Sequence, residues 1–159
     1  MLLLAALAMG VIAGLRTFTA PAAFFLTRGG IAGYILAVCA VGEYIADALP
    51  KIPPRTGFPS IAFRSLSGAI TGWFIGSLGG VSAAIGGAIA GIIGALVGTF
   101  GGYHLRMAAI AKFGAVPAAI LEDVIAIALA AMVMSQYSAY ERSFHSYAKL
   151  VGCWQHGGC

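Results

Sequence analysis

Long apolar stretches that contain a few ionisable residues constrain this chain more than any other feature. A charge in lipid hydrocarbon is costly, so such a residue usually faces the interior of a helix bundle or a watery cavity and marks an ion, proton or substrate path. The ionisable residues inside or at the edges of these stretches are Arg16, Glu43, Asp47, Arg106, Glu122 and Asp123. The sequence therefore predicts a polar site inside an apolar bundle.

The composition is typical of a membrane protein. Of the 159 residues, 60% are hydrophobic and only 9% are charged, whereas about 25% of residues are charged in soluble domains. The 23 glycines are spread among aliphatic residues, which favours close helix contact in lipid over a flexible linker. The net charge of +4 lies next to apolar segments and suits contact with anionic lipid headgroups. We find no nucleic-acid-binding motif.

Glycine and proline divide the chain into five segments. Each is long enough to cross a hydrocarbon core of about 30 Å as a helix, and they cover residues 2–27, 31–49, 62–79, 82–111 and 117–137. We expect an all-α fold, a polytopic membrane helix bundle with about five transmembrane helices and a Gly-rich fourth helix. Residues 1–140 would form a single domain, followed by an interfacial or disordered tail at residues 141–159.

Several sequence blocks occur in a characteristic order. They are Gly14-Leu15-Arg16-Thr17-Phe18-Thr19-Ala20-Pro21-Ala22, Gly42-Glu43-x-x-Ala46-Asp47-x-Leu49-Pro50-Lys51-x-Pro53-x-Arg55-Thr56, Arg64-x-x-Ser67-Gly68-Ala69, Gly98-Thr99-Phe100-Gly101-Gly102-Tyr103 with Arg106, and Pro117 with Leu121-Glu122-Asp123. Over residues 10–135 this pattern resembles a family of small bacterial integral membrane proteins of unknown function. The resemblance implies a multi-pass protein of the bacterial inner membrane, and it implies no activity or substrate.

The distribution of basic residues predicts an orientation. In a five-helix arrangement one side collects Lys51, Arg55, Arg64, Arg106 and Lys112, and the other side collects Arg28, Arg142 and Lys149. Cytoplasmic loops are richer in Lys and Arg. We therefore expect a cytoplasmic N-terminus on the same side as the proline-rich loop at residues 50–59, and an external C-terminus.

The ionisable residues are expected to form two clusters. Arg16 and Glu43 reach a similar depth in consecutive helices joined by a short turn, so we expect a buried ion pair between them. Asp47 lies one helical turn from Glu43 on the same face, where two carboxylates repel each other unless a proton or cation intervenes. Arg106 should meet the acids Glu122 and Asp123 in a second cluster that opens toward the same side.

Three further features carry weaker predictions. The fourth segment has a stripe of small residues that packs against the first or third segment, or against a second copy in a homodimer; it contains Gly87, Gly91, Gly94, Gly98 and Gly102. Lys51, Arg55 and Arg64 either bind a lipid phosphate or anionic substrate, or simply orient the protein. Cys153, His156 and Cys159 have the ligand types of a zinc site, but an interfacial tail or a disulfide explains them as well. We expect no cofactor.

Three function classes remain open. The leading hypothesis is a small transporter or channel for an ion or small solute, with the six ionisable residues along its path and possible assembly into an oligomer, most simply a dimer. The second is a structural or assembly subunit whose charges only fix helix packing. The third is a membrane enzyme that acts on a lipid headgroup; the sequence has no nucleophile motif for it, and we expect no enzymatic activity.

Overall fold

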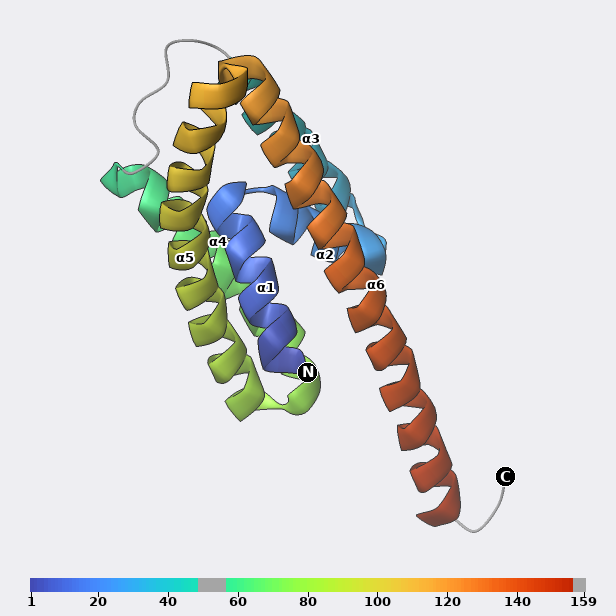
Figure 1. Ribbon diagram of the computed structural model, residues 1–159. Helices are drawn as coiled ribbons and strands as arrows, with labels where there is room; N and C mark the ends of the chain where they lie inside the picture. The colour runs from blue at the N-terminus through green and yellow to red at the C-terminus, as the bar shows by residue number, and fades with distance from the viewer. Residues whose placement is uncertain (49–56, 156–159) are drawn as a thin grey trace.

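The computed structural model describes residues 1–48 and 57–155, with side chains for residues 1–45 and 57–146. The described residues confirm the all-α prediction: they form helices and no strand (Figure 1). The elements are α1 (Leu2–Leu15), α2 (Thr19–Arg28), α3 (Ile31–Ala48), α4 (Phe58–Gly76), a short 3₁₀ helix η1 (Ser77–Gly79), α5 (Val81–Phe113) and α6 (Ala115–Gln155).

Glycines let α1, α4 and α5 pack with their backbones in contact. A Cβ added to Gly91 would lie 2.1 Å from the carbonyl oxygen of Gly68 in α4, and one added to Gly98 would lie 2.1 Å from that of Val11 in α1. The stripe in α5 thus contacts both neighbours within one chain: Gly87 and Gly91 face α4, and Gly94, Gly98 and Gly102 face α1. Small residues at a helix interface permit this close approach.

The first predicted segment is not one helix. Helix α1 ends at Leu15, Arg16 is extended with φ −139° and ψ 114°, and α2 begins only at Thr19. Pro21 explains the break, because its ring clashes with the carbonyl group four residues earlier and it has no N–H to donate. Proline is tolerated in the first turn of a helix, where α2 places it. The prediction of a continuous helix over residues 2–27 is therefore wrong.

The break reverses the chain. Met1 lines a cavity together with Tyr137, and Arg28 at the end of α2 donates a hydrogen bond to the hydroxyl of the same tyrosine at 3.2 Å. The start of α1 and the end of α2 thus both lie beside the middle of α6, and α3 runs from there toward the turn between α5 and α6 (Figure 1). Met1 and the end of α3 are therefore apart along the bundle, whereas the predicted five-helix arrangement has them on the same side; the orientation in the membrane stays a prediction.

Two further boundaries differ from the prediction. Helix α4 begins at Phe58 with Pro59 in its first turn, because proline is compatible with the first turn of a helix. Helix α6 continues to Gln155, so residues 141–155 are helical; of the two predicted forms of this tail, interfacial or disordered, the interfacial one stays a prediction. The prolines at positions 50, 53 and 54 lie outside the described residues.

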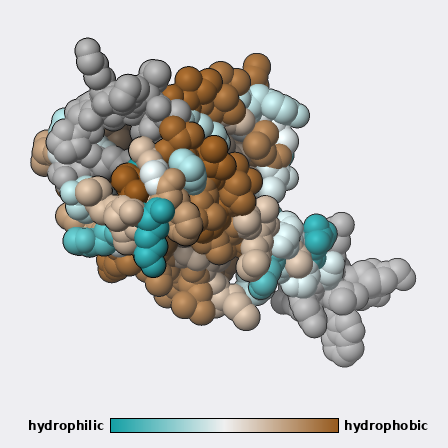
Figure 2. All heavy atoms as spheres, turned by 45° about the horizontal axis from the view of Figure 1, so that its top comes forward, coloured by the Kyte–Doolittle hydropathy of each residue, from teal (hydrophilic) through white to brown (hydrophobic). Residues whose placement is uncertain are grey.

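Small side chains fill the interior, and large aliphatic side chains cover the outside. Alanine dominates the buried apolar residues, whereas Ile31, Val38 and Leu105 are 80%, 72% and 73% exposed. Figure 2 shows hydrophobic residues over much of the face in view. Two helices, Val81–Phe113 and Ala115–Ser146, are long and apolar enough to cross a membrane by length and composition.

Candidate functional site at the helix break

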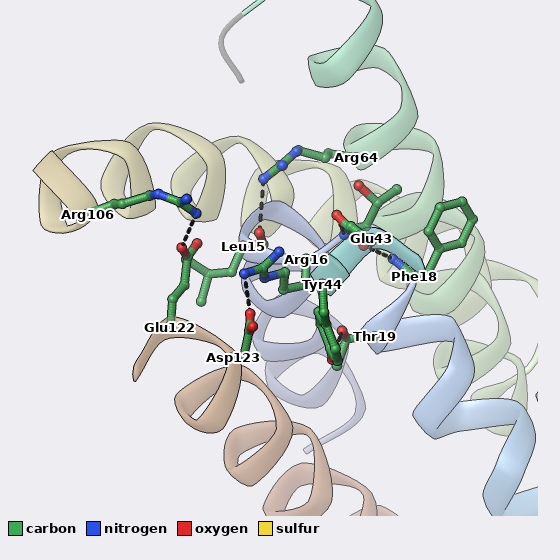
Figure 3. A network of polar contacts seen from close by, with 11 residues as sticks. Leu15, Arg16, Phe18, Thr19, Glu43, Tyr44, Arg64, Arg106, Glu122 and Asp123 are labelled. Carbon is green, nitrogen blue, oxygen red and sulfur yellow. Dashed lines mark hydrogen bonds and ion pairs between the residues drawn. The ribbon is translucent and has the colours of Figure 1, made fainter. Parts of the chain in front are cut away.

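Polar side chains from α3, α4, α5 and α6 converge on the break between α1 and α2 (Figure 3). A helix end leaves carbonyl groups at its C-terminus and N–H groups at its N-terminus without partners in the helix. When such an end is buried, these groups need side chains or water to bind them. The break therefore forms a compact polar site in an otherwise apolar bundle.

The carbonyl groups at the end of α1 are bound by α4 and α5. Arg64 Nη1 donates to the carbonyl oxygen of Gly14 and, at 3.1 Å, to that of Leu15. The hydroxyl of Thr99 donates to the carbonyl oxygen of Ala95 in its own helix at 2.7 Å and also lies 3.3 Å from the Gly14 oxygen. The C-terminal end of a helix carries a partial negative charge, which a cation stabilises. Arg64, only 5% exposed, thus caps α1.

The carbonyl group of Thr17 has a separate partner. In a regular helix it would accept a hydrogen bond from the N–H of residue 21, but Pro21 has none. The hydroxyl of Ser67 in α4 donates to it instead, at 2.5 Å. Ser67 therefore replaces the bond that Pro21 removes.

The N–H groups at the start of α2 are bound by one carboxylate. Glu43 Oε1 accepts from the backbone N–H of Thr17 at 2.9 Å, and Oε2 accepts from that of Phe18 at 3.1 Å. A helix N-terminus carries a partial positive charge, so an anion is stabilised there. Glu43 thus fixes the start of α2 to α3.

The side chain of Arg16 is fully buried at the centre of the site. It forms an ion pair with Asp123 of α6, whose side chain is 20% exposed. Its guanidinium also lies over the ring of Tyr44, 5.1 Å from the ring centroid, within the range of a cation–π interaction. The hydroxyl of Tyr44 is hydrogen-bonded to that of Thr19 at 2.7 Å, which links this group to the first turn of α2.

A second ion pair lies beside the first. Arg106 Nη1 is 3.0 Å from Glu122 Oε2, and their side chains are 16% and 10% exposed. Glu122 and Asp123 are consecutive residues of α6 that bind different arginines. These two pairs join the start of α6 to α5 and to the helix break.

The structure gathers five of the six predicted ionisable residues around the helix break: Arg16, Glu43, Arg106, Glu122 and Asp123 (Figure 3). The pairing differs from the prediction, because Arg16 is ion-paired with Asp123 while both oxygens of Glu43 bind backbone N–H groups. The helix break causes this difference, since it creates buried N–H groups that require an acceptor. The side chain of Asp47 lies outside the described residues.

The structure describes Arg64 of the predicted basic site, but not the other side chains of the predicted basic and zinc sites. Arg64 points into the bundle and binds carbonyl groups, so it does not belong to a surface site for headgroups; Lys51 and Arg55 lie outside the described residues. The side chains of Cys153, His156 and Cys159 also lie outside them. Within the described part, no group of three His, Cys, Asp or Glu residues could hold a metal ion.

Sequence reasoning missed several residues of the site, namely Thr19, Tyr44, Ser67 and Thr99. Pro21 is the sequence feature that points to them, because a proline at this position cannot donate the helical hydrogen bond to the carbonyl group of Thr17. This signal predicts that a donor is needed, but it does not say which residue supplies it. Hydroxyl side chains are common in apolar helices, so the identity of the partner depends on the tertiary structure.

No family model, curated protein or solved structure matches this chain. The resemblance to small bacterial membrane proteins stays a prediction. Chemically, the site holds buried charges of both signs inside an apolar bundle.

Proposed function

We propose that this protein is an integral membrane transporter or channel that moves a small ion or solute past the break between α1 and α2. One observation carries the proposal. The chain is interrupted between α1 and α2 inside the bundle, and charged side chains from neighbouring helices bind the backbone groups on both sides of the break. Many transporters build their binding sites from discontinuous helices of this kind. The outward large aliphatic residues and two apolar helices of sufficient length support a membrane location.

The exposure of the site supports a path rather than a sealed cluster. Arg16 is fully buried, while its partner Asp123 is 20% exposed and the neighbouring Glu122 is 10% exposed. Acidic groups thus extend from the buried guanidinium toward the surface. We propose that a species enters along these acids from the end of the molecule that holds Arg106.

The basic residues support an orientation in the bacterial inner membrane. The C-terminal end of α5, whose last turn contains Lys112, lies toward the end where α3 finishes and α4 begins (Figure 1), and positively charged ends usually face the cytoplasm. This end would be cytoplasmic, and Met1 would be external because the break reverses the chain. The number of membrane crossings and the assembly into a homodimer remain predictions.

Flux measurements in liposomes test the function. Purified protein is reconstituted, and the fluxes of protons, K⁺, Na⁺ and Cl⁻ are followed with ion-sensitive dyes. We expect a flux above that of empty liposomes, which Glu43→Gln and Arg16→Gln alter, whereas Arg142→Gln at an exposed position of α6 leaves it unchanged. Wild-type protein that is folded and inserted but carries none of these ions, nor small solutes in a swelling assay, would contradict transport.

A structural subunit is the second candidate. The complete burial of Arg16 and the 5% exposure of Arg64 favour it, because buried pairs can specify helix arrangement without doing chemistry. This role predicts that Glu43→Gln changes stability and leaves the membrane leak of the liposomes unaltered.

A further inference from the structure

The two sides of the helix break are held by chemically different groups. Arg64 and Ser67 bind the carbonyl groups, and neither side chain changes charge near neutral pH. Glu43 binds the N–H groups of Thr17 and Phe18, and a carboxylate can take up a proton. Among the described side chains that bind backbone groups of the break, Glu43 is therefore the one that protonation can change.

The occupied positions also restrict which ion the break can accept. Metal cations at broken helices are coordinated by unwound carbonyl groups, but here a guanidinium already occupies the carbonyl groups of Gly14 and Leu15. Anions bind at helix N-termini, but here the carboxylate of Glu43 occupies that place. A proton is the ion that this arrangement can accept without displacing a side chain, because it adds directly to Glu43.

We infer that Glu43 is a proton-binding residue, and that its protonation releases the start of α2 from α3. An ionised carboxylate is an acceptor at both oxygens, whereas the protonated form carries one O–H donor and has less acceptor capacity. The bonds from the N–H groups of Thr17 and Phe18 then become weaker, since bonds to a charged acceptor are roughly twice as strong as neutral ones. Helix α1 keeps its own partners and stays in place.

The surroundings of Glu43 contain groups of both signs and room for α2 to move. Among the described side chains, the charged or titratable groups around the break are Arg16, Tyr44 on α3, Arg64 on α4 and Asp123 on α6. A cavity of about 550 Å³ lies between α2, α3 and α6 and is lined by Thr19 and Tyr44 among others. Once released, the first turn of α2 has space on this side. The inference rests on the proposed transport function for its purpose, though not for its test.

Hydrogen–deuterium exchange in lipid nanodiscs tests the inference. The exchange of peptides that contain Thr17 and Phe18 is followed across pH and corrected with peptides from α5, which report the chemical pH dependence of exchange. In the wild type we expect this segment to become about tenfold less protected at low pH, the effect of losing charge-assisted bonds. Glu43→Gln should be less protected at every pH, and Glu43→Asp should keep the pH dependence. Arg142→Gln, which removes a charge at an exposed position of α6, should behave as the wild type.

Each outcome decides one question. Constant protection of the segment across pH in the wild type, or the same pH dependence in Glu43→Gln, would overturn the inference. If Glu43→Gln does not fold, Glu43→Asp and the wild type still decide it. Proton flux in liposomes, measured with a pH-sensitive dye, decides the proposed function separately: pH-dependent exchange without any ion or solute flux leaves the proton-binding role standing and contradicts transport.

Discussion

Ser67 donates a hydrogen bond from its hydroxyl to the carbonyl oxygen of Thr17 at 2.5 Å, and this bond compensates for a proline four residues further along the chain. Pro21 removes the donor that a helix would supply, and α4 provides another. The position of the break is thus set by local chemistry, while its stability depends on a residue about fifty positions away in the sequence.

Ser67→Ala should destabilise the protein because it leaves a buried carbonyl group without its donor. We expect a loss of about 1–3 kcal/mol in the free energy of unfolding, measured by titration with a denaturing detergent and followed by circular dichroism. Ser77→Ala is the matched control, since its hydroxyl bonds to Phe74 at an exposed position. Equal effects of the two substitutions would contradict the role of Ser67.

Pro21→Ala should reduce the contribution of Ser67 to the free energy of unfolding. Alanine restores an N–H group that can donate to the Thr17 carbonyl oxygen, so the loss caused by Ser67→Ala should be smaller in the Pro21→Ala background. A double-mutant cycle measures this coupling, which we expect at about 0.5 kcal/mol or more. Strictly additive effects would show that the two residues act independently.

Gly91→Ala should disrupt the packing of α4 against α5. Its Cβ would lie 2.1 Å from the carbonyl oxygen of Gly68, and forcing extra atoms into a packed interface typically costs about 1–3 kcal/mol. Gly101→Ala in the same helix is the control, because nothing lies within 4 Å of its added Cβ, and alanine there should stabilise the helix by about 0.5–1 kcal/mol. The same detergent titration distinguishes the two variants, and similar midpoints would contradict the packing argument.

Replacing one residue of the buried Arg16–Asp123 ion pair should lower the free energy of unfolding more than replacing both residues. Asp123→Asn removes the ionised carboxylate that pairs with Arg16, and such a change typically destabilises by about 3–5 kcal/mol when the pair is buried; the 20% exposure of Asp123 places the expected loss at the lower end. Combining it with Arg16→Met should recover part of that loss. The pair Arg28 and Glu141, with side chains 41% and 25% exposed, serves as the control and should contribute less than about 1 kcal/mol.

Tyr44→Phe removes the hydroxyl that binds Thr19. We expect a loss of about 0.5–1.5 kcal/mol and a rise in exchange at the start of α2, since this bond also connects α2 to α3. Tyr34→Phe lies on the same helix at an exposed position and should change neither quantity. An unchanged unfolding midpoint for Tyr44→Phe would show that the hydrogen bond between Tyr44 and Thr19 does not stabilise the protein.

The residues that gather at the break were predictable in kind but not in pairing. Arg16 and Glu43 stand out because charges in apolar stretches need partners, and both lie at the break. The sequence also favours an Arg16–Glu43 pair, because equal depth in two consecutive helices is all that spacing reveals. Spacing cannot show that Thr17 and Phe18 present free N–H groups, and these groups are what Glu43 binds.

The sequence by itself determined that this chain is helical, that small residues lie inside and that a few charges must be paired, because helix periodicity, side-chain volume and the cost of an unpaired charge are local properties. Only the tertiary structure decided that α1 and α2 turn back on each other, that Arg64 faces inward and that Asp123 pairs with Arg16. A buried backbone break is tolerated only where distant helices supply its missing hydrogen bonds, and which helices reach it is fixed by how the whole bundle packs.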